Sequence, residues 1–253
     1  MKKQEAIKLG SQTAKKGFKN ERDIAKKFNN WKNDEDAKKW LSIMKYDLNK
    51  IEKVVAIVLS NQYKSDIQVK VSIYLKEAIS AENISIKLVS NPKGYNQVDK
   101  RWVDKYAEMW SMPKQVKKLL KHFTGEIKPY KTNIRDKRRM FLDEFTDEEQ
   151  QKIQSFFMKN KLLIVGDILK GRGRLSAEWM MVALRIDREV TWTLKPINLV
   201  LNIFGNGKVE ITKKGSLKIG KITMQRKGGD AGRKTAQMLQ FKINPVELFD
   251  SNG

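Results

Sequence analysis

Two consecutive runs of alternating apolar and polar residues, between Tyr63 and Ser90, constrain the fold of this chain more than any other feature. In the first run every second residue is apolar, at Ile67, Val69, Val71, Ile73 and Leu75. In the second run one side carries Ile84, Ile86 and Leu88, and the other carries Ser85, Lys87 and Val89. A period of two residues is typical of a half-buried β-strand. We therefore expect two strands, joined by a polar connection, that can pair as a hairpin.

The hairpin carries one acid and one base in suggestive positions. Asp66 opens the polar side of the first strand, and Lys87 is the only charged residue of the second run. If the strands pair, both side chains can project from one face of the sheet. A carboxylate and a backbone carbonyl, here that of Ile86, can hold a hard cation such as Mg²⁺, and a lysine can position a water and stabilise charge on a phosphorane. The spacing fits the PD-(D/E)xK nuclease pattern, with Ser85 in place of the second acid, but a plain salt bridge between the acid and the lysine has the same spacing more often.

The charge of the chain points to a polyanionic partner. It has 52 Lys and Arg residues against 29 Asp and Glu residues, a formal net charge of +23 at pH 7. Nucleic acid is the first expectation and an anionic membrane surface a distant second. No apolar run reaches the roughly 18 residues of a spanning helix, and the first residues lack the hydrophobic region of an export signal. We therefore expect a cytoplasmic protein with no membrane partner.

Cysteine and histidine usage excludes several kinds of site. The chain has no cysteine and a single histidine, His122. Disulfides, cysteine zinc sites, zinc hydrolases and histidine-based nucleophilic triads are therefore excluded. We expect His122 itself to lie at a helix end, where the C-terminal dipole favours it.

Hydrophobic periodicity, together with glycine, proline and capping residues, predicts the remaining helices and strands. Helices are predicted over residues 3–9, 17–31, 34–47, 48–59, 97–110, 113–123 and 146–160, with a short one from Pro196 to Phe204. Further strands are predicted over residues 177–186, 190–194, 208–213, 216–224 and 239–244. The fold class is thus mixed α/β, and we expect one domain in three parts: a helical part with the hairpin (1–125), a helical insert (about 126–175) and a β-rich part (176–253).

Several long segments carry a resemblance to a known family. Ser65-Asp66 and Ser85-Ile86-Lys87 fall in register with a Ser-Asp, then Gln-x-Lys, signature. Other matching segments are GFKNERDIAKKF, KLVSNPKGYNQVDK, HFTGE, DKRRMF, GRGR, AEW, QRKGGDAGRKTAQMLQFKINP and ELFD. The chain thus resembles, nearly from end to end, the small type II restriction endonucleases of the HinP type, which cut GCGC.

The resemblance implies a fold and an activity. The fold would be a PD-(D/E)xK core, a central mixed sheet flanked by helices, and the activity Mg²⁺-dependent hydrolysis of double-stranded DNA at a short palindromic site. Asp66 and the Ile86 carbonyl would bind the metal and Lys87 would assist the water. Ser85 stands where the family has glutamine, and its hydroxyl is a neutral oxygen and a poor metal ligand. Glu21 could supply a second acid, or could simply pair with the dipole of its helix.

Two segments are candidates for DNA recognition. Gln97 matches a family glutamine that inserts into the DNA stack, Lys100 lies in the same segment, and Asn96 precedes them; the alternative for Asn96 and Gln97 is ordinary helix capping. A second segment combines cations, an amide and an acid with glycines, at Gln225, Arg226, Lys227, Gly228, Gly229, Asp230 and Arg233. Arginine or lysine to guanine and aspartate to cytosine is the chemistry that a G·C site requires, whereas a generic phosphate-binding loop has a similar composition.

Two other functions remain open from sequence. One is a DNA-binding protein whose nuclease site has decayed at Ser85, and the other is a basic RNA-associated protein that stacks bases on its aromatic residues. The sequence leaves a homodimer open, and the resemblance implies a cognate DNA methyltransferase as a functional partner.

Overall fold

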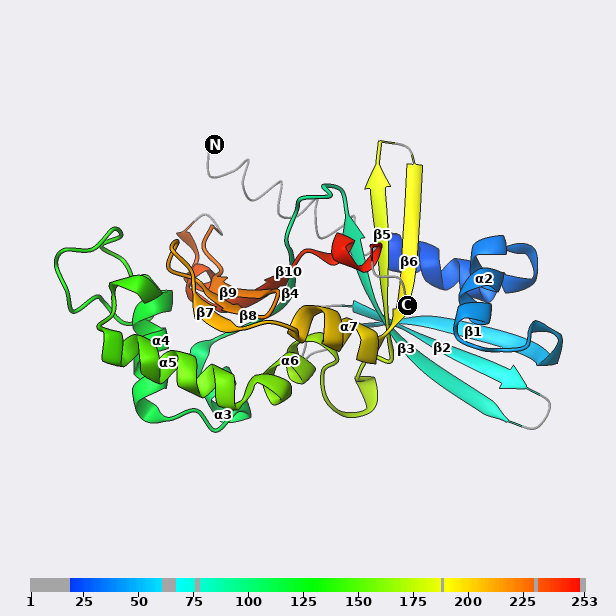
Figure 1. Ribbon diagram of the computed structural model, residues 1–253. Coiled ribbons are helices and arrows are strands. Elements are labelled where there is room, and N and C mark those ends of the chain that lie inside the picture. Colours follow the sequence, from blue (N-terminus) through cyan, green and yellow to red (C-terminus); the bar gives the residue numbers. More distant parts are fainter. Residues whose placement is uncertain (1–18, 61–66, 76–77, 188, 230–231, 251–253) are drawn as a thin grey trace. The chain divides into compact units, whose positions relative to one another are not determined.

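The computed structural model describes residues 19–60, 67–75, 78–187, 189–229 and 232–250 (Figure 1). These residues divide into two compact units. The hairpin unit comprises described residues within 19–96, 170–200 and 244–250, and the helical unit comprises those within Gln97–Leu169 and Leu201–Ile243. The expectation of a single domain in three parts stays a prediction, and the helix expected over residues 3–9 lies outside the described residues.

A mixed five-stranded sheet forms the centre of the hairpin unit. Its strands, in the spatial order β1-β2-β3-β5-β6, are β1 (Ile51–Ser60), β2 (Ile67–Leu75), β3 (Ile79–Val89), β5 (Trp179–Ile186) and β6 (Glu189–Pro196). Strands β3 and β5 run parallel, and the other neighbours are antiparallel. The predicted hairpin is confirmed as β2 and β3, and the sheet is mixed, as expected.

Helices cover the apolar face of this sheet. Residues 19–29 are helical, followed by η1 (Trp31–Asn33) and α2 (Glu35–Ile43). Asp34 caps α2, since its Oδ1 accepts a hydrogen bond from the backbone N–H of Ala37 at 3.0 Å. Phe28 and Trp40 belong to one core cluster with Val69, Val71 and Ile84 of the hairpin. Two short helices, η4 (Gly173–Leu175) and η7 (Pro245–Leu248), complete the unit.

The expectation of a buried helix over residues 48–59 is wrong. The chain makes only a turn of helix, η2 (Leu48–Lys50), before β1 begins. The run Val54-Val55-Ala56-Ile57-Val58 is rich in β-branched residues, which pack well on a pleated surface and lose side-chain freedom in a helix. Pairing with β2 stabilises the strand over the helix, because the apolar residues of this run do not recur at helical spacing.

The helical unit combines a second sheet with four helices and the end of a fifth. The sheet has the order β4-β10-β9-β8-β7, with β4 (Asn96–Arg101), β10 (Leu239–Ile243), β9 (Ile222–Arg226), β8 (Leu217–Ile219) and β7 (Val209–Ile211). The helices are α3 (Val103–Met109), α4 (Lys114–Thr124), α5 (Asp147–Lys159), α6 (Lys161–Leu169) and α7 (Ile197–Gly205), with short turns η3 (Leu142–Glu144) and η6 (Lys234–Gln237). Strand β4 and helix α7 each begin in the hairpin unit.

Aromatic stacking holds the centre of the helical unit. Tyr106 stacks on Trp110, with ring centroids 4.7 Å apart, and both rings meet Phe241 of β10 edge-on. The indole Nε1 of Trp110 donates a hydrogen bond to the buried Asp167 at 2.9 Å, which satisfies the polar end of the indole.

The helix expected over residues 97–110 is only half right. Its first residues form β4, which lies beside β10, and its later residues form α3.

Most other sequence predictions are confirmed. Helix α5 begins with the expected capping box of Thr146 and Glu149, and α4 ends at Gly125 in the left-handed conformation. Strands β7 and β8 form the hairpin around Lys214-Gly215, although the predicted strand over residues 216–224 is broken into β8 and β9. Within the described residues, no helix is long and apolar enough to cross a membrane.

Gly125 supplies a test of this packing. Its φ is +83°, and a Cβ placed there would lie 2.6 Å from the carbonyl oxygen of Arg138. We predict that Gly125→Ala lowers the free energy of unfolding by about 2–4 kcal/mol, from left-handed strain and the forced contact. Gly166→Ala on α6 is the matched control, because nothing lies within 4 Å of its Cβ. It should be neutral or stabilising by up to about 1 kcal/mol, and equal urea midpoints for the two variants would contradict the assigned geometry.

Candidate functional site

The register of the hairpin defines one polar face. Gln68 of β2 lies directly opposite Ser85 of β3 in the antiparallel ladder, so their side chains project from the same face of the sheet. Lys87 follows Ser85 by two residues and shares that face. The structure therefore brings Ser85 and Lys87 together, as expected, and adds Gln68 beside them.

These polar side chains are buried. Gln68 and Ser85 are each 1% exposed and Lys87 is 5% exposed. On the neighbouring strand β5, Met180 pairs with Ser85 and Val182 pairs with Lys87, and both are buried. A lysine is almost never fully buried unless it serves a specific interaction. The face is thus a polar island beside an apolar strand.

Several polar atoms of this island have no hydrogen-bond partner within the part of the chain that the structure describes. They are Oγ of Ser85 and both the oxygen and the nitrogen of the Gln68 amide. Each such atom costs about 1–3 kcal/mol in desolvation, so a buried pair of them in register calls for a ligand. The oxygen of the Gln68 amide is of a type that binds hard cations, whereas the Ser85 hydroxyl is a poor metal ligand. Gln68 is therefore the neutral side chain of this face that fits a cation such as Mg²⁺.

The structure gives less information on the other two proposed metal ligands, Asp66 and the carbonyl of Ile86. Asp66 lies outside them, immediately before β2 in the sequence. The side chain of Ile86 is buried in the core cluster on the opposite face, and the role of its carbonyl stays a prediction. Among described residues, no group of three or more His, Cys, Asp or Glu side chains could hold a metal ion. A cation at this face would therefore depend on neutral oxygens and on Asp66.

Glu21 is buried but comes from the helical layer. It is 8% exposed and lies on the helix of residues 19–29. The same helix contributes Ile24, Ala25 and Phe28 to the core that includes Ile84 and Ile86, on the face opposite Ser85. Its place as a second acid stays a prediction.

Two nearby acids, Glu82 and Glu178, form hydrogen bonds that stabilise the fold. Glu82 accepts hydrogen bonds from the Tyr46 hydroxyl at 2.6 Å and from Nε1 of Trp179 at 3.0 Å. Burial and the Glu82 carboxylate raise the pKa of Tyr46 to about 12. Glu178 accepts from the backbone N–H of Asn83 at 2.8 Å, and burial followed by repulsion from Glu82 raises its pKa. These acids join the ends of β3 and β5.

His122 is a structural residue in the helical unit. It occupies the last turn of α4, as predicted, with its Nδ1 2.8 Å from the Lys128 carbonyl oxygen and its ring edge-on to Tyr130. Burial, partly offset by the bond to Lys128, lowers its pKa. The predicted position at a helix end is confirmed.

The first segment proposed for DNA recognition is a strand, so the alternative that Asn96 and Gln97 cap a helix is wrong. Both residues and Lys100 lie on β4 and are half-buried. Nδ2 of Asn96 donates to the Leu88 carbonyl at 3.0 Å, which ties the start of β4 to the end of β3. Any DNA contact of Gln97 and Lys100 stays a prediction.

The second segment continues the hairpin of β9 and β10. Gln225 and Arg226 end β9, the backbone N–H of Lys227 donates to the carbonyl of Met238 at 2.8 Å, and that of Gly228 donates to the carbonyl of Ala236 at 2.9 Å. Gly228 and Gly229 have φ of +64° and +58°, and a Cβ added at either would meet nothing within 4 Å. Backbone conformation alone therefore requires glycine at these two positions. Arg233 is exposed, and Asp230 lies outside the described residues.

Gln68 is the site residue that sequence reasoning missed. A glutamine on the polar side of an alternating strand looks like an ordinary exposed residue, and the hairpin register is what buries it. The available signal was its position two residues after Asp66, on the same side of the strand.

The hairpin unit thus places a buried lysine and two neutral side chains on one face of a mixed sheet. The solved structure of the restriction endonuclease MspI in complex with its cognate DNA shares the fold, with a TM-score of 0.63 at 16% sequence identity over 93% of this chain and 92% of that one. No curated protein sequence matches the chain.

The family follows from the sequence itself. The model of the R.HinP1I restriction endonuclease family matches residues 44–249, and the chain belongs to that family. It is therefore a type II site-specific deoxyribonuclease, and the predicted enzyme class and fold are confirmed. Glu21 precedes the matched residues.

Gln68 provides a test that does not depend on cleavage. Because both polar atoms of its amide are buried without a partner among described residues, Gln68→Leu should raise the free energy of unfolding by about 1–2 kcal/mol in metal-free buffer. Gln240→Leu is the matched control, since Gln240 is 3% exposed and its Nε2 donates to the carbonyls of Arg226 and Lys227. It should lose about 1 kcal/mol. A loss of similar size in both variants would show that the Gln68 amide is satisfied.

Proposed function

We propose that this enzyme hydrolyses double-stranded DNA with Mg²⁺ at the face of Gln68, Ser85 and Lys87, and that its target is GCGC. The observation that carries the proposal is the buried ammonium group of Lys87, which shares one sheet face with two neutral side chains in register. The target is supported only by the resemblance to enzymes that cut GCGC. The net charge of +23 supports a strong, salt-sensitive attraction to the DNA backbone.

The metal would be held by a mixed set of oxygens. We propose Asp66 and the backbone carbonyl of Ile86 as ligands, with Glu21 as an outer acid. Asp66 is two residues before Gln68, so alternation along the strand supports placing its carboxylate on the polar face. When bound there, Mg²⁺ would activate a water and neutralise charge on the phosphate.

Gln68 offsets the change at residue 85. The family signature has glutamine where this chain has Ser85, and the amide of Gln68 faces that serine directly across the ladder. We propose that Gln68 Oε1 supplies the neutral amide oxygen from β2 instead of β3. This favours an active enzyme over a decayed nuclease site, because the polar face keeps an amide oxygen and its lysine.

Lys87 would act on the attacking water and on the phosphate. Its ammonium group donates hydrogen bonds and carries charge in a poorly solvated setting, where electrostatic stabilisation of a developing phosphorane is strongest. Asn96, Gln97, Lys100 and the residues from Gln225 to Arg233 are proposed to contact the DNA. A homodimer would allow both strands to be cut in one encounter, and we propose a cognate methyltransferase as functional partner in the cytoplasm.

Removing the ammonium group tests this function. We predict that Lys87→Ala lowers the rate of cleavage of a GCGC plasmid with Mg²⁺ by at least about 10³-fold, because a charge-stabilising group is lost. Binding to a duplex without metal should stay within about threefold, since base and phosphate contacts elsewhere supply the affinity. The readouts are plasmid linearisation, mapping of the cut ends and a fluorescence binding titration.

The control variant, Lys70→Ala, distinguishes the loss of one positive charge from the loss of a catalytic group. Lys70 lies on the same face of β2 but is half-buried, away from Ser85 in the ladder. Lys70→Ala should cleave within about fivefold of the wild type. Cleavage that survives Lys87→Ala would contradict the role proposed for Lys87. A wild-type protein that binds the duplex but never cuts it would instead favour the decayed-site alternative.

A further inference from the structure

Three arginines of the helical unit gather around one carboxylate. Nε of Arg138 donates to Oδ1 of Asp136 at 2.9 Å, and its Nη2 donates to Oδ2 at 3.0 Å. Nε of Arg139 is 3.7 Å from Oδ2 of the same aspartate, which is too long for a hydrogen bond. Arg226, at the end of β9, lies within the electrostatic field of both arginines. One carboxylate, already engaged by Arg138, faces three cations.

Two hydrogen bonds to the end of α4 hold segments that neighbour Arg139 and β9. The N–H of Met140 donates to the His122 carbonyl of α4 at 3.0 Å, which fixes the turn that carries Arg139. Nε2 of Gln237 donates to the Gly125 carbonyl at 2.7 Å, which fixes the connection that follows β9. The segment that carries Arg139 and the strand that ends at Arg226 are thus each held by hydrogen bonds within the helical unit.

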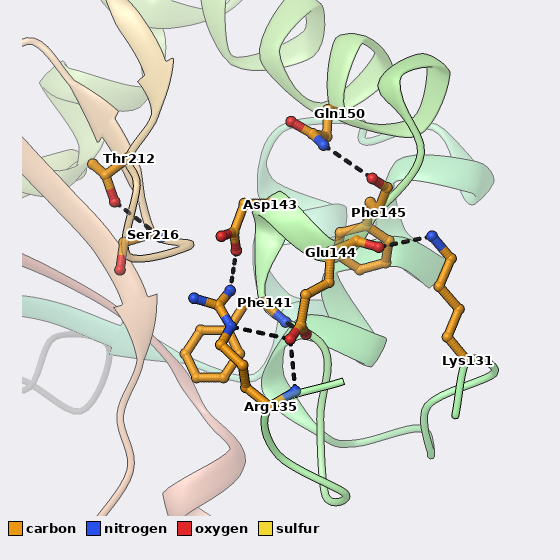
Figure 2. Close-up of polar contacts among 9 residues, drawn as sticks. All are labelled: Lys131, Arg135, Phe141, Asp143, Glu144, Phe145, Gln150, Thr212 and Ser216. Carbon is orange, nitrogen blue, oxygen red and sulfur yellow. Dashed lines mark hydrogen bonds and ion pairs between the residues drawn. The ribbon is translucent and has the colours of Figure 1, made fainter. Parts of the chain in front are cut away.

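A neighbouring arginine shows what a structural ion pair looks like in this unit. The guanidinium groups of Arg135 and Arg139 both lie over the ring of Phe141, at 4.1 and 3.9 Å from its centroid. Arg135 is neutralised by Asp143 and by Glu144, whose Oε1 accepts from its Nε at 3.0 Å (Figure 2). Arg139 has the same aromatic support, but its ion pair with Asp136 is longer, at 3.7 Å, and Arg138 shares that carboxylate.

The two arginines are strained electrostatically. Burial, and then repulsion from Arg226, lowers the pKa of Arg139 to about 10. Burial, and then repulsion from Arg138, lowers the pKa of Arg226. The side chain of Arg139 is 16% exposed, and Nε of each arginine is buried without a hydrogen-bond partner among the described residues. An anion at the outer nitrogens of the two guanidinium groups would cancel the repulsion.

We propose that Arg139 and Arg226 together hold one phosphodiester of the DNA backbone. The planar N–H fork of a guanidinium matches phosphate oxygens, and two forks on one phosphate are stronger than either alone. Arg139 thereby becomes a DNA-binding residue, and Arg226 contacts phosphate instead of reading a guanine. The inference rests on the proposed function, since the anion comes from the bound duplex.

The test measures metal-free binding of the full-length protein to two duplexes, one with GCGC and one without, over a range of salt. We expect Arg139→Gln to weaken binding about tenfold on both duplexes and to lower the salt slope by about one, the loss of one phosphate contact. Arg226→Gln should give the same pair of changes, and it decides the matter if Arg139→Gln does not fold. The fold-loss of affinity in the double variant should be smaller than the product of the two single fold-losses, because both side chains share one phosphate.

Lys152→Gln is the charge-matched control. Its Nζ is 2.6 Å from Oε1 of Glu148 on the same helix, so the charge is already neutralised. It should leave affinity and salt slope unchanged. Inorganic phosphate, compared with chloride at equal ionic strength, should raise the melting temperature of the wild type more than that of Arg139→Gln.

Two results would overturn the assignment. Unchanged binding by folded Arg139→Gln and Arg226→Gln would remove the phosphate site, while leaving cleavage at GCGC and the proposed function intact. A loss confined to the GCGC duplex would assign these arginines to base reading. Failure of the wild type to bind or cut any duplex would instead count against the proposed function.

Discussion

The antiparallel register that sets Gln68 opposite Ser85 is the constraint on which the rest of the site depends. A slip of one residue would turn every polar side chain of the hairpin into the core and every core side chain outward. Three features hold the register: pairing of β2 with β1, parallel pairing of β3 with β5, and the hydrogen bond from Asn83 to Glu178 at the start of that parallel pair. Together they fix Lys87 on the face that also carries the two neutral side chains.

At two places the protein buries polar or charged groups without full compensation, and at each place a ligand would supply the missing interaction. On the hairpin, the Gln68 amide and the Ser85 hydroxyl are buried without partners among described residues, and the amide oxygen suits a hard cation. In the helical unit, Arg139 and Arg226 are partly buried and repel each other, which suits an anion. Elsewhere similar groups are satisfied, as with Arg135 beside Glu144 and Trp110 beside Asp167. Some core atoms, such as Nε1 of Trp40, also lack a partner among described residues. The two places named above differ because each combines such atoms with a buried or repelled cation.

Local patterns predicted the elements whose environment they encode. The alternation of β2 and β3, the capping box of α5 and the glycine stop of α4 all depend on neighbours in sequence, and all are confirmed. Strand β1 was misread because an apolar run has no period of its own, and β4 because its partner, β10, lies far along the chain. Gln68 was missed for the same reason, since its burial follows from pairing. The family resemblance supplied the enzyme class, and Asp66 and Asp230 lie outside the described residues.

The most direct test of the proposed site locates the metal. Crystals of the protein with duplex DNA and Mn²⁺, which replaces Mg²⁺ and scatters anomalously, would show the ion as a peak. We expect a peak at the polar face of the hairpin, with Gln68 Oε1 within the roughly 2.0–2.6 Å of direct coordination and the Lys87 ammonium on the same side of the phosphate. A peak bound elsewhere, with Gln68 and Lys87 remote from it, would contradict the site.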